Sequence, residues 1–128
     1  MAEASPTVTD SKIMWTGHAG FKMTFNYNGT EKVVYMDPWI NGNPKYPACL
    51  KNEDNESPIP DDADLILVTH GHFDHAADAP AIQKASTKAD CKVVAGFELA
   101  NFYKLAKGVP EASVCPMGIG GTHDFGFC

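Results

Sequence analysis

LILVTHGHFDH, residues 65–75, is the stretch that predicts both the fold and the chemistry of this chain. Its first four residues are continuously apolar, which is typical of a strand covered on both faces of a sheet. Four residues with metal-binding side chains follow: His70, His72, Asp74 and His75. Because α/β proteins place their sites at the carboxyl ends of strands, the stretch predicts a buried strand that leads directly into a binding site.

The spacing of these four side chains suits a pair of metal ions. In an extended turn, His70, His72 and Asp74 point to one side and His75 lies next to Asp74, while Gly71 lets the backbone turn tightly. Imidazole nitrogen and carboxylate oxygen favour zinc, and also iron or manganese. His70 with His72 can then hold one ion and Asp74 with His75 another. A hydroxide shared between ions about 3.5–4 Å apart would be the nucleophile. The alternative is a polar loop that is merely rich in histidine, although three of the five histidines fall in this stretch.

The residues before this stretch predict an antiparallel meander. A short apolar run at 13–15 predicts a strand, and the alternation of apolar and polar residues from 21 to 27 predicts a half-buried one. Asn28-Gly29 separates the second strand from an apolar run at 33–36, and this pair is a strong signal for a hairpin. Residues 37–62 hold five of the nine prolines and predict a long loop, which at this length is usually functional or disordered.

The residues after the stretch predict alternating helices and strands. A helix is expected over 79–88 with Asp78 as its N-cap, followed by a short buried strand at 91–95. A second helix is expected over 98–107, ended by Gly108. Helices between strands favour an α/β fold in which neighbouring strands run parallel, so we predict an α/β class with a mixed sheet.

The composition is that of one ordinary domain. With 128 residues, 44% hydrophobic and 20% charged, we expect a single domain over residues 11–128 after a disordered leader at 1–10. The net charge of −6 and the scattered basic residues argue against a nucleic-acid partner, and no run approaches the roughly 20 apolar residues of a membrane span. Because the N-terminus lacks the features of a secretory signal, we expect a cytoplasmic protein whose four cysteines are reduced rather than paired in disulfides.

Thr-His-x-His-x-Asp-His after an apolar strand resembles the metallo-β-lactamase superfamily. Other stretches are similar to the branch of metal-dependent hydrolases that includes ascorbate-6-phosphate lactonase. They are Trp15–Gly20, Asp37–Trp39, Ala63–His70 and Met117–Thr122, the last with Gly118 where the branch has Asn. The resemblance runs from Ile13 to Phe127 and therefore covers most of the chain.

The resemblance implies roles for the metal-binding residues. His70 and His72 would ligate a first metal ion, and Asp74 and His75 a second, with two zinc ions in the complete fold. Asp74 would also act in catalysis by orienting the metal-bound water. His18 would lie close to the metals as a second catalytic residue, the alternative being a structural histidine in a strand-end turn.

Two further residues have less definite roles. Asp37 would lie near the site behind the ligands, or it simply opens a turn before a proline. His123 matches no ligand position of the family, so we expect it at the surface.

The superfamily fold is an αββα sandwich of two similar halves, and further ligands come from the second half. This sequence resembles the N-terminal half, so we expect a fragment or truncated form of a longer hydrolase. The alternatives are a natural half that pairs with itself or another subunit, and a chain with a binding-only role. An apolar sheet face that lacks its second half favours such association.

The expected function is metal-dependent hydrolysis of a small anionic ester, lactone or phosphate-containing substrate by a metal-bound hydroxide. The alternative is a non-catalytic metal-binding or assembly module that needs a second half or a partner to complete its site. A nuclease role fits poorly with the acidic charge balance.

Overall fold

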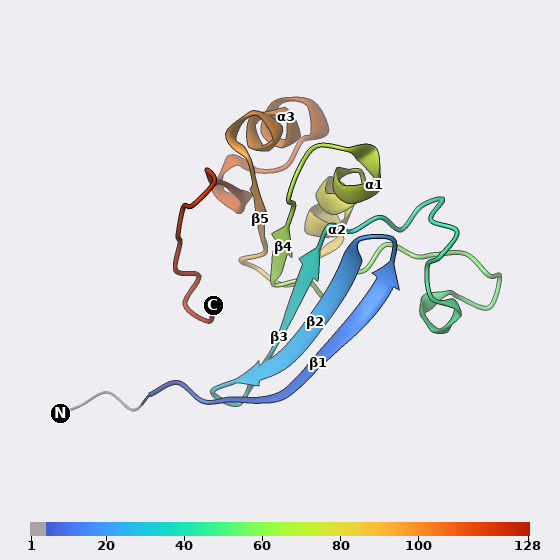
Figure 1. Cartoon of the computed structure of the whole chain (residues 1–128), viewed down its shortest axis with the longest axis horizontal. Coiled ribbons are helices and arrows are strands. Elements are labelled where there is room, and N and C mark those ends of the chain that lie inside the picture. Colours follow the sequence, from blue (N-terminus) through green and yellow to red (C-terminus); the bar gives the residue numbers. More distant parts are fainter. Residues whose placement is uncertain (1–4) are drawn as a thin grey trace.

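The computed structural model describes residues 5–128 and has one six-stranded sheet with the α-helices against one of its faces (Figure 1). The strands lie in the sheet in chain order: β1 (Val8–Gly17), β2 (Gly20–Tyr27), β3 (Thr30–Met36), β4 (Leu65–Leu67), β5 (Lys92–Ala95) and β6 (Val114–Pro116). The helices are α1 (Phe73–Ala76), α2 (Ala79–Ala85) and α3 (Phe97–Lys107), with short 3-10 helices η1 (Ala48–Leu50) and η2 (Glu111–Ser113). The predicted α/β class with a mixed sheet is confirmed.

The first half of the sheet is the predicted antiparallel meander. β1 pairs with β2 and β2 with β3, both antiparallel. Between β2 and β3, Asn28 has a φ of 49° and Gly29 a φ of 84°, and a type I′ hairpin turn needs positive values at both central positions. β1 begins at Val8 because Val8 pairs with Tyr27. Residues 8–10 of the expected leader therefore belong to the sheet, whereas its residues 1–4 lie outside the described residues.

The second half of the sheet is parallel. β3 pairs with β4, β4 with β5 and β5 with β6, all in parallel register. Strand β6 has only three residues, and a run this short carried no signal in the sequence. Since the carboxyl ends of β3, β4 and β5 lie along one edge, the loops that follow these strands meet there.

Alternation along the strands divides the core between the two faces of the sheet. On the face toward the helices, Ile66 of β4 and Val93 of β5 are fully buried with Ile82 of α2. On the other face, Leu65 is buried among apolar residues that include Phe127 of the C-terminal segment. β4 is therefore covered on both sides, as its unbroken apolar sequence predicts.

Two details around α2 differ from expectation. The helix ends at Ala85 rather than at residue 88, because Ser86 leaves helical geometry and its hydroxyl donates to Ala63 O at 2.7 Å. Asp78 stands at the N-cap position, but its carboxylate caps no helix N–H. It accepts from Ile40 N at 2.6 Å and from Asn41 N at 3.0 Å, and so ties the long loop to α2.

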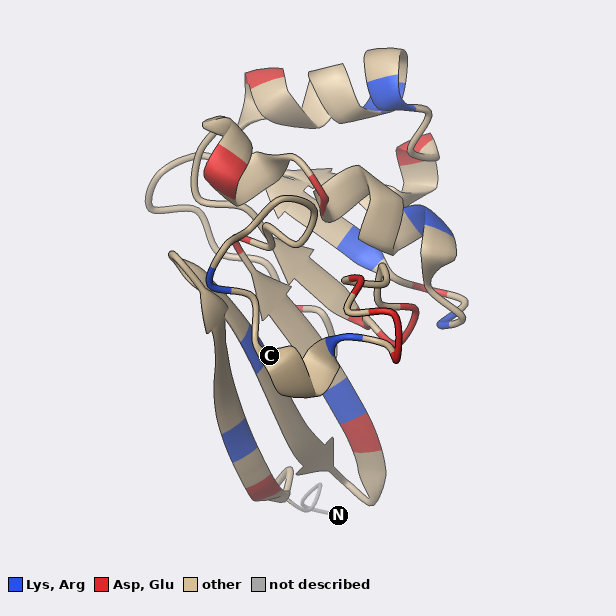
Figure 2. Cartoon of the chain, turned by 90° about the vertical axis from the view of Figure 1, so that its right-hand side faces the viewer, with Lys and Arg blue, Asp and Glu red and all other residues tan. Residues whose placement is uncertain are grey.

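Across residues 5–128, the charged side chains form no single-sign stripe. Figure 2 shows the lysines apart from one another on several elements, with acidic residues between them. Among the helices of residues 5–128, none is long and apolar enough to cross a membrane.

Candidate metal centre

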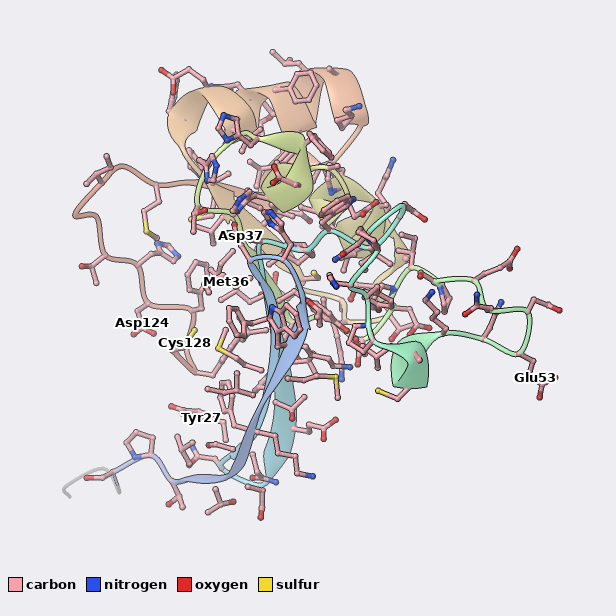
Figure 3. All side chains as sticks on the ribbon, turned by 45° about the vertical axis from the view of Figure 1, so that its right-hand side comes forward. Tyr27, Met36, Asp37, Glu53, Asp124 and Cys128 are labelled. Atoms are coloured by element: carbon pink, nitrogen blue, oxygen red, sulfur yellow. The ribbon has the colours of Figure 1, made fainter. Side chains whose placement is uncertain are left out.

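Three segments that are distant in the sequence come together at the carboxyl edge of the sheet. His18 lies in the turn between β1 and β2, Asp37 follows β3, and residues 69–75 follow β4. The parallel pairing of β3 and β4 continues past the strands, since Asp37 N donates to Leu67 O at 2.9 Å. Figure 3 shows Asp37 at the end of β3, whereas Glu53 lies far out on the loop that follows.

The turn that carries His18 is fastened to the loop after β3 by Asn43. Its buried side chain donates from Nδ2 to Thr16 O at 3.2 Å and to Trp39 O at 2.9 Å. His18 adopts a left-handed backbone with a φ of 54°, and Trp15 Nε1 donates to its carbonyl at 2.8 Å. This conformation is uncommon for residues other than glycine, although histidine adopts it more readily than most, and these hydrogen bonds hold the turn in place.

Gly17 permits the close approach of the β1–β2 turn to the loop after β3. Its replacement by alanine is expected to destabilise the fold strongly. Its φ is +94°, and an added Cβ would lie 2.7 Å from the carbonyl carbon of Lys45. Gly42 is a matched control, since its φ is +76° but nothing lies within 4 Å of an added Cβ. In urea denaturation we expect Gly42→Ala to cost about 1 kcal/mol of unfolding free energy and Gly17→Ala about 3 kcal/mol or more. Equal losses would contradict this account of the contact.

The predicted ligands 70–75 are divided between a loop and a helix. The expected extended turn holds only as far as His72, because α1 begins at Phe73. His75 N and Ala76 N both donate to His72 O at 3.0 Å, which places Asp74 and His75 in the first turn of α1. The expectation that Asp74 continues an extended alternation is therefore wrong. The predicted division into a pair His70/His72 and a pair Asp74/His75 coincides with this division between loop and helix.

His70 and His72, the two predicted ligands on the loop before α1, are arranged as a chelate. His70 Nε2 and His72 Nδ1 face each other at 2.9 Å. Two nitrogens that bind one tetrahedral zinc ion at about 2.0–2.1 Å lie roughly 3.3 Å apart, so a small opening of the pair would admit an ion. Both side chains are exposed, so the pair is accessible from solvent.

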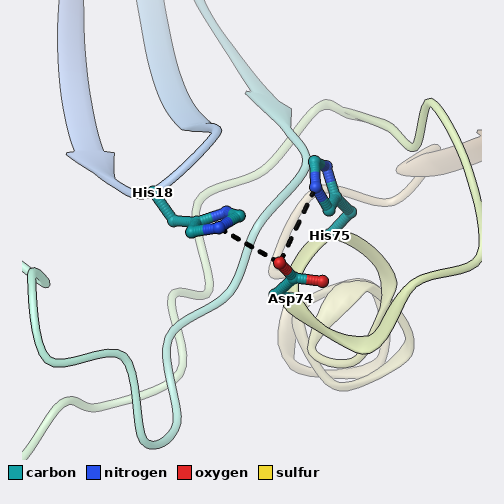
Figure 4. Close-up of side chains that lie close together, drawn as sticks. All are labelled: His18, Asp74 and His75. Atoms are coloured by element: carbon teal, nitrogen blue, oxygen red, sulfur yellow. Dashed lines mark ion pairs between the residues drawn. The ribbon is translucent and has the colours of Figure 1, made fainter.

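Asp74 and His75, the two predicted ligands on α1, lie close to His18 (Figure 4). His18 Nε2 lies 3.1 Å and His75 Nε2 lies 3.9 Å from Asp74 Oδ2. One ligand atom from each of the three residues falls within 4.8 Å of the others. The two groups are neighbours, because the rings of His70 and His75 are 4.1 Å apart between centroids. The structure therefore brings His18 to the predicted ligands rather than leaving it as an isolated turn residue.

Asp37 is linked by hydrogen bonds to both groups of predicted ligands, directly to His75 and through Thr69 to His70. Its side chain is only 5% exposed, and its Oδ1 accepts from Thr69 N at 2.8 Å. Oδ2 accepts from Thr69 Oγ1 at 2.7 Å and lies 2.9 Å from His75 Nδ1. Thr69 Oγ1 in turn lies 3.0 Å from His70 Nδ1. Of the two roles weighed for Asp37, the contacts place it behind the predicted ligands.

These hydrogen bonds determine which nitrogen of each ring faces the site. A carboxylate only accepts, so His75 carries its proton on Nδ1 and presents a free lone pair at Nε2, the atom directed to Asp74. The Thr69 hydroxyl donates its hydrogen bond to Asp37 and accepts one from His70 Nδ1. His70 Nε2 therefore carries no proton and faces His72. A histidine ligand with its second nitrogen bound to a carboxylate is the usual arrangement at protein metal sites.

Some residues of the site had no signal in the sequence. Thr69 belongs to the motif, but nothing local in the sequence indicates its link to Asp37, and Asn43 lies in a loop whose path cannot be read from local pattern. His123 is exposed, as predicted, and its ring contacts Phe125 at a centroid distance of 4.5 Å. It takes no part in the cluster of ligand atoms found among the described residues.

A mixed sheet with a histidine and aspartate cluster at its carboxyl edge defines an α/β protein with a candidate metal centre, and comparison of the sequence agrees with this description. Residues 12–116 match the family described as Beta-lactamase superfamily domain, and the chain belongs to that family.

Similar proteins carry names that refer to metals. The chain is 41% identical over 115 residues to a UPF0173 metal-dependent hydrolase of Pyrobaculum islandicum, covering 90% of this chain and 45% of the relative. It is 40% identical over 116 residues to proteins with the same description from Thermoplasma volcanium and Bacillus cytotoxicus, covering 91% of this chain and 43% of each relative. The chain thus spans a little less than half the length of the curated relatives that it matches.

Proposed function

We propose that this chain carries the metal-binding part of a metal-dependent hydrolase. One observation supports this above all: donor atoms from two distant segments converge at one sheet edge, with His18, Asp74 and His75 within 4.8 Å and His70 beside His72 at 2.9 Å. The proposal assigns His70 and His72 to one metal ion, and Asp74 with His75 to a second. The names of the relatives as metal-dependent hydrolases support a metal-dependent function.

The donor set is nitrogen and carboxylate oxygen, which suits zinc and also accepts manganese or iron. A bound ion of this kind supplies a hydroxide nucleophile at neutral pH and polarises the substrate carbonyl or phosphoryl group. The protein's own part is to hold the ligands in one geometry. Asp37 orients His75 directly and His70 through Thr69, and Asp74 Oδ2 lies 3.1 Å from His18 Nε2.

His18 adds a group that is able to move a proton. Its side chain is 43% exposed, and its Nε2 lies 3.1 Å from Asp74. We propose that His18 acts beside Asp74, either as a further ligand or as a proton donor to the leaving group of a substrate. The left-handed backbone of His18 supports a functional role, because such conformations of non-glycine residues cluster at active sites.

The substrate that we propose is a small anionic ester, lactone or phosphate-containing compound, in line with the resemblance to the ascorbate-6-phosphate lactonase branch. A metal-bound hydroxide would attack the carbonyl carbon of an ester or lactone, or the phosphorus of a phosphate ester, and the alcohol oxygen would leave. The four cysteines are free thiols, which supports a reducing compartment such as the cytoplasm.

A second candidate function is a metal-binding or assembly module without catalysis. The observation in its favour is the small number of donors: within residues 5–128, the first ion would take only His70 and His72. Catalytic zinc normally has three protein ligands, so a two-ligand position needs another donor to become a hydrolytic centre.

Metal binding and turnover by the isolated chain distinguish these candidates. The chain is purified without chelator, its zinc, manganese and iron are measured, and zinc is titrated into metal-free protein. Hydrolysis of a phosphodiester and of a simple lactone is then followed with and without added chelator. We expect about two zinc ions per chain and chelator-sensitive turnover. Binding without turnover would support the module, and a chain that binds no metal would overturn both.

A further inference from the structure

Two aromatic side chains that offer no metal-binding atom lie next to the proposed ligands. Trp39 lies on the loop after β3, and its ring centroid is 5.6 Å from that of His18. Phe73 is the first residue of α1 and stands between His72 and Asp74 in the chain. Its ring centroid is 5.4 Å from that of Trp39. The two rings thus form an apolar surface beside the candidate metal centre, referred to below as the aromatic wall.

Trp39 is held in place by its ring and by its backbone. Its Nε1 donates to Asn41 O at 2.7 Å, and its carbonyl oxygen accepts from Asn43 Nδ2 at 2.9 Å. Pro38 and Ile40, the residues on either side of it, are buried. A side chain that is already fixed loses little conformational freedom when a ligand binds to it. Trp39 is therefore the preorganised half of the aromatic wall.

Phe73 completes the aromatic wall from an exposed position. It is 68% exposed, and its ring plane is inclined by 80° to that of Trp39. A flat guest can stack on one of two perpendicular rings and contact the edge of the other, and both geometries are favourable between aromatic rings. Single exposed apolar residues are common on protein surfaces, but this one contacts a fixed tryptophan and stands between two proposed ligands. Its placement therefore points to contact with a ligand of the site.

The charges of the candidate metal centre restrict what the aromatic wall receives. Asp74 follows Phe73 directly in the chain, and Glu98 lines a cavity beside His70. Bound metal ions would attract one anionic group of a substrate, whereas these carboxylates repel a second one. The part of the substrate that meets the aromatic wall is therefore expected to be uncharged.

We propose that the aromatic wall binds a flat, uncharged aromatic ring that the substrate carries next to its ester or phosphate group. The substrate class is then an aryl or arylmethyl ester, and Trp39 with Phe73 determines this specificity. The inference rests on the proposed function, because the metal ions hold the reacting group while the wall holds the ring beside it.

The test measures binding of three phosphonates to the zinc-loaded chain by calorimetry. A phosphonate binds zinc and is not hydrolysed, so the measurement requires no turnover. Phenylphosphonate carries a flat ring, cyclohexylphosphonate carries a ring of similar bulk without flat faces, and methylphosphonate carries neither. We expect phenylphosphonate to bind about tenfold more tightly than methylphosphonate, because one face of its ring leaves water. It should bind about twofold or more tightly than cyclohexylphosphonate, because only a flat ring stacks.

Variants locate this preference on the aromatic wall. Phe73→Ala should reduce the preference for phenylphosphonate over methylphosphonate from about tenfold to about threefold or less. Phe73→Leu keeps apolar bulk and should abolish only the distinction between phenyl and cyclohexyl groups. Phe97→Ala is the matched control, since Phe97 also begins a helix and is 65% exposed but is not part of the wall. Its preference should equal that of the parent.

An NMR measurement on the parent chain reports on Trp39 directly. The sequence has two tryptophans, and the Trp39→Phe variant identifies which indole N–H signal belongs to Trp39. We expect this signal to shift on addition of phenylphosphonate and to change little with methylphosphonate, because the current of a stacked ring alters the shifts of nearby protons. Equal shifts with the two compounds would contradict contact between Trp39 and the ring.

The outcomes separate this inference from the proposed function, because the zinc content of every sample is measured. A zinc-loaded chain that binds phenylphosphonate and methylphosphonate equally, or binds neither, overturns the inference alone. Equal preferences of the Phe73→Ala and Phe97→Ala variants also overturn it, as does binding of cyclohexylphosphonate that matches or exceeds that of phenylphosphonate. A chain that holds no zinc overturns the proposed function, and the inference fails with it.

Discussion

Changing His70 and His72 together to alanine is expected to remove one of the two zinc ions from the chain. The two imidazoles face each other at 2.9 Å and are the donors that we assign to that ion. With both removed, the zinc affinity of the position should fall by far more than the roughly 10- to 100-fold loss that follows removal of a supporting hydrogen bond. The measurement is zinc per chain by elemental analysis after dialysis, together with a zinc titration.

Two comparisons make this result specific. His123→Ala removes an exposed histidine that lies outside the ligand cluster, and its zinc content should equal that of the parent. Asp74→Asn combined with His75→Ala should remove the other ion and leave the His70 and His72 position occupied. If the zinc content is unchanged when His70 and His72 are replaced, these residues are not ligands and the proposed first metal position is wrong.

Replacing Asp37 with asparagine is expected to weaken zinc binding about 10- to 100-fold although Asp37 is not itself a proposed ligand. The new amide nitrogen would donate toward His75 Nδ1, where the carboxylate now accepts at 2.9 Å. His75 would then carry its proton on Nε2, the nitrogen that faces Asp74, and could no longer bind metal there. Zinc affinity is measured by competition with a chromophoric chelator, and the tautomer from imidazole nitrogen shifts in NMR spectra.

Asp78→Asn is the matched control for loss of a buried carboxylate. Asp78 is also buried and accepts hydrogen bonds, from Ile40 N and from Asn41, but it contacts none of the proposed ligands. We expect it to lose stability with little change in zinc affinity. Thr69→Val removes only the link to His70, so it should affect the first ion more than the second. Equal effects of Asp37→Asn and Asp78→Asn on zinc affinity would mean that Asp37 acts through stability alone.

The sequence was most informative where the signal is local. The apolar run of β4, the alternation of β2 and the Asn28-Gly29 turn each depend on residues within a few positions of one another, and the structure has each of them in the expected place. Predictions of element ends were weaker. The helix expected to reach residue 88 stops at Ala85 because Ser86 finds a partner in Ala63, 23 positions earlier in the chain.

The candidate site shows the same contrast between neighbours in the sequence and residues that only the fold brings together. The sequence by itself determined that His70, His72, Asp74 and His75 stand together after a buried strand, because these residues are neighbours in the chain. Only the tertiary structure decided that His18 reaches Asp74, and that Asp37 sets the orientation of His75 across 38 positions and acts on His70 through Thr69. The physical reason is that parallel pairing of β3 with β4 and the fastening of the β1–β2 turn by Asn43 bring distant segments to one edge, and such contacts leave no periodic pattern in the sequence.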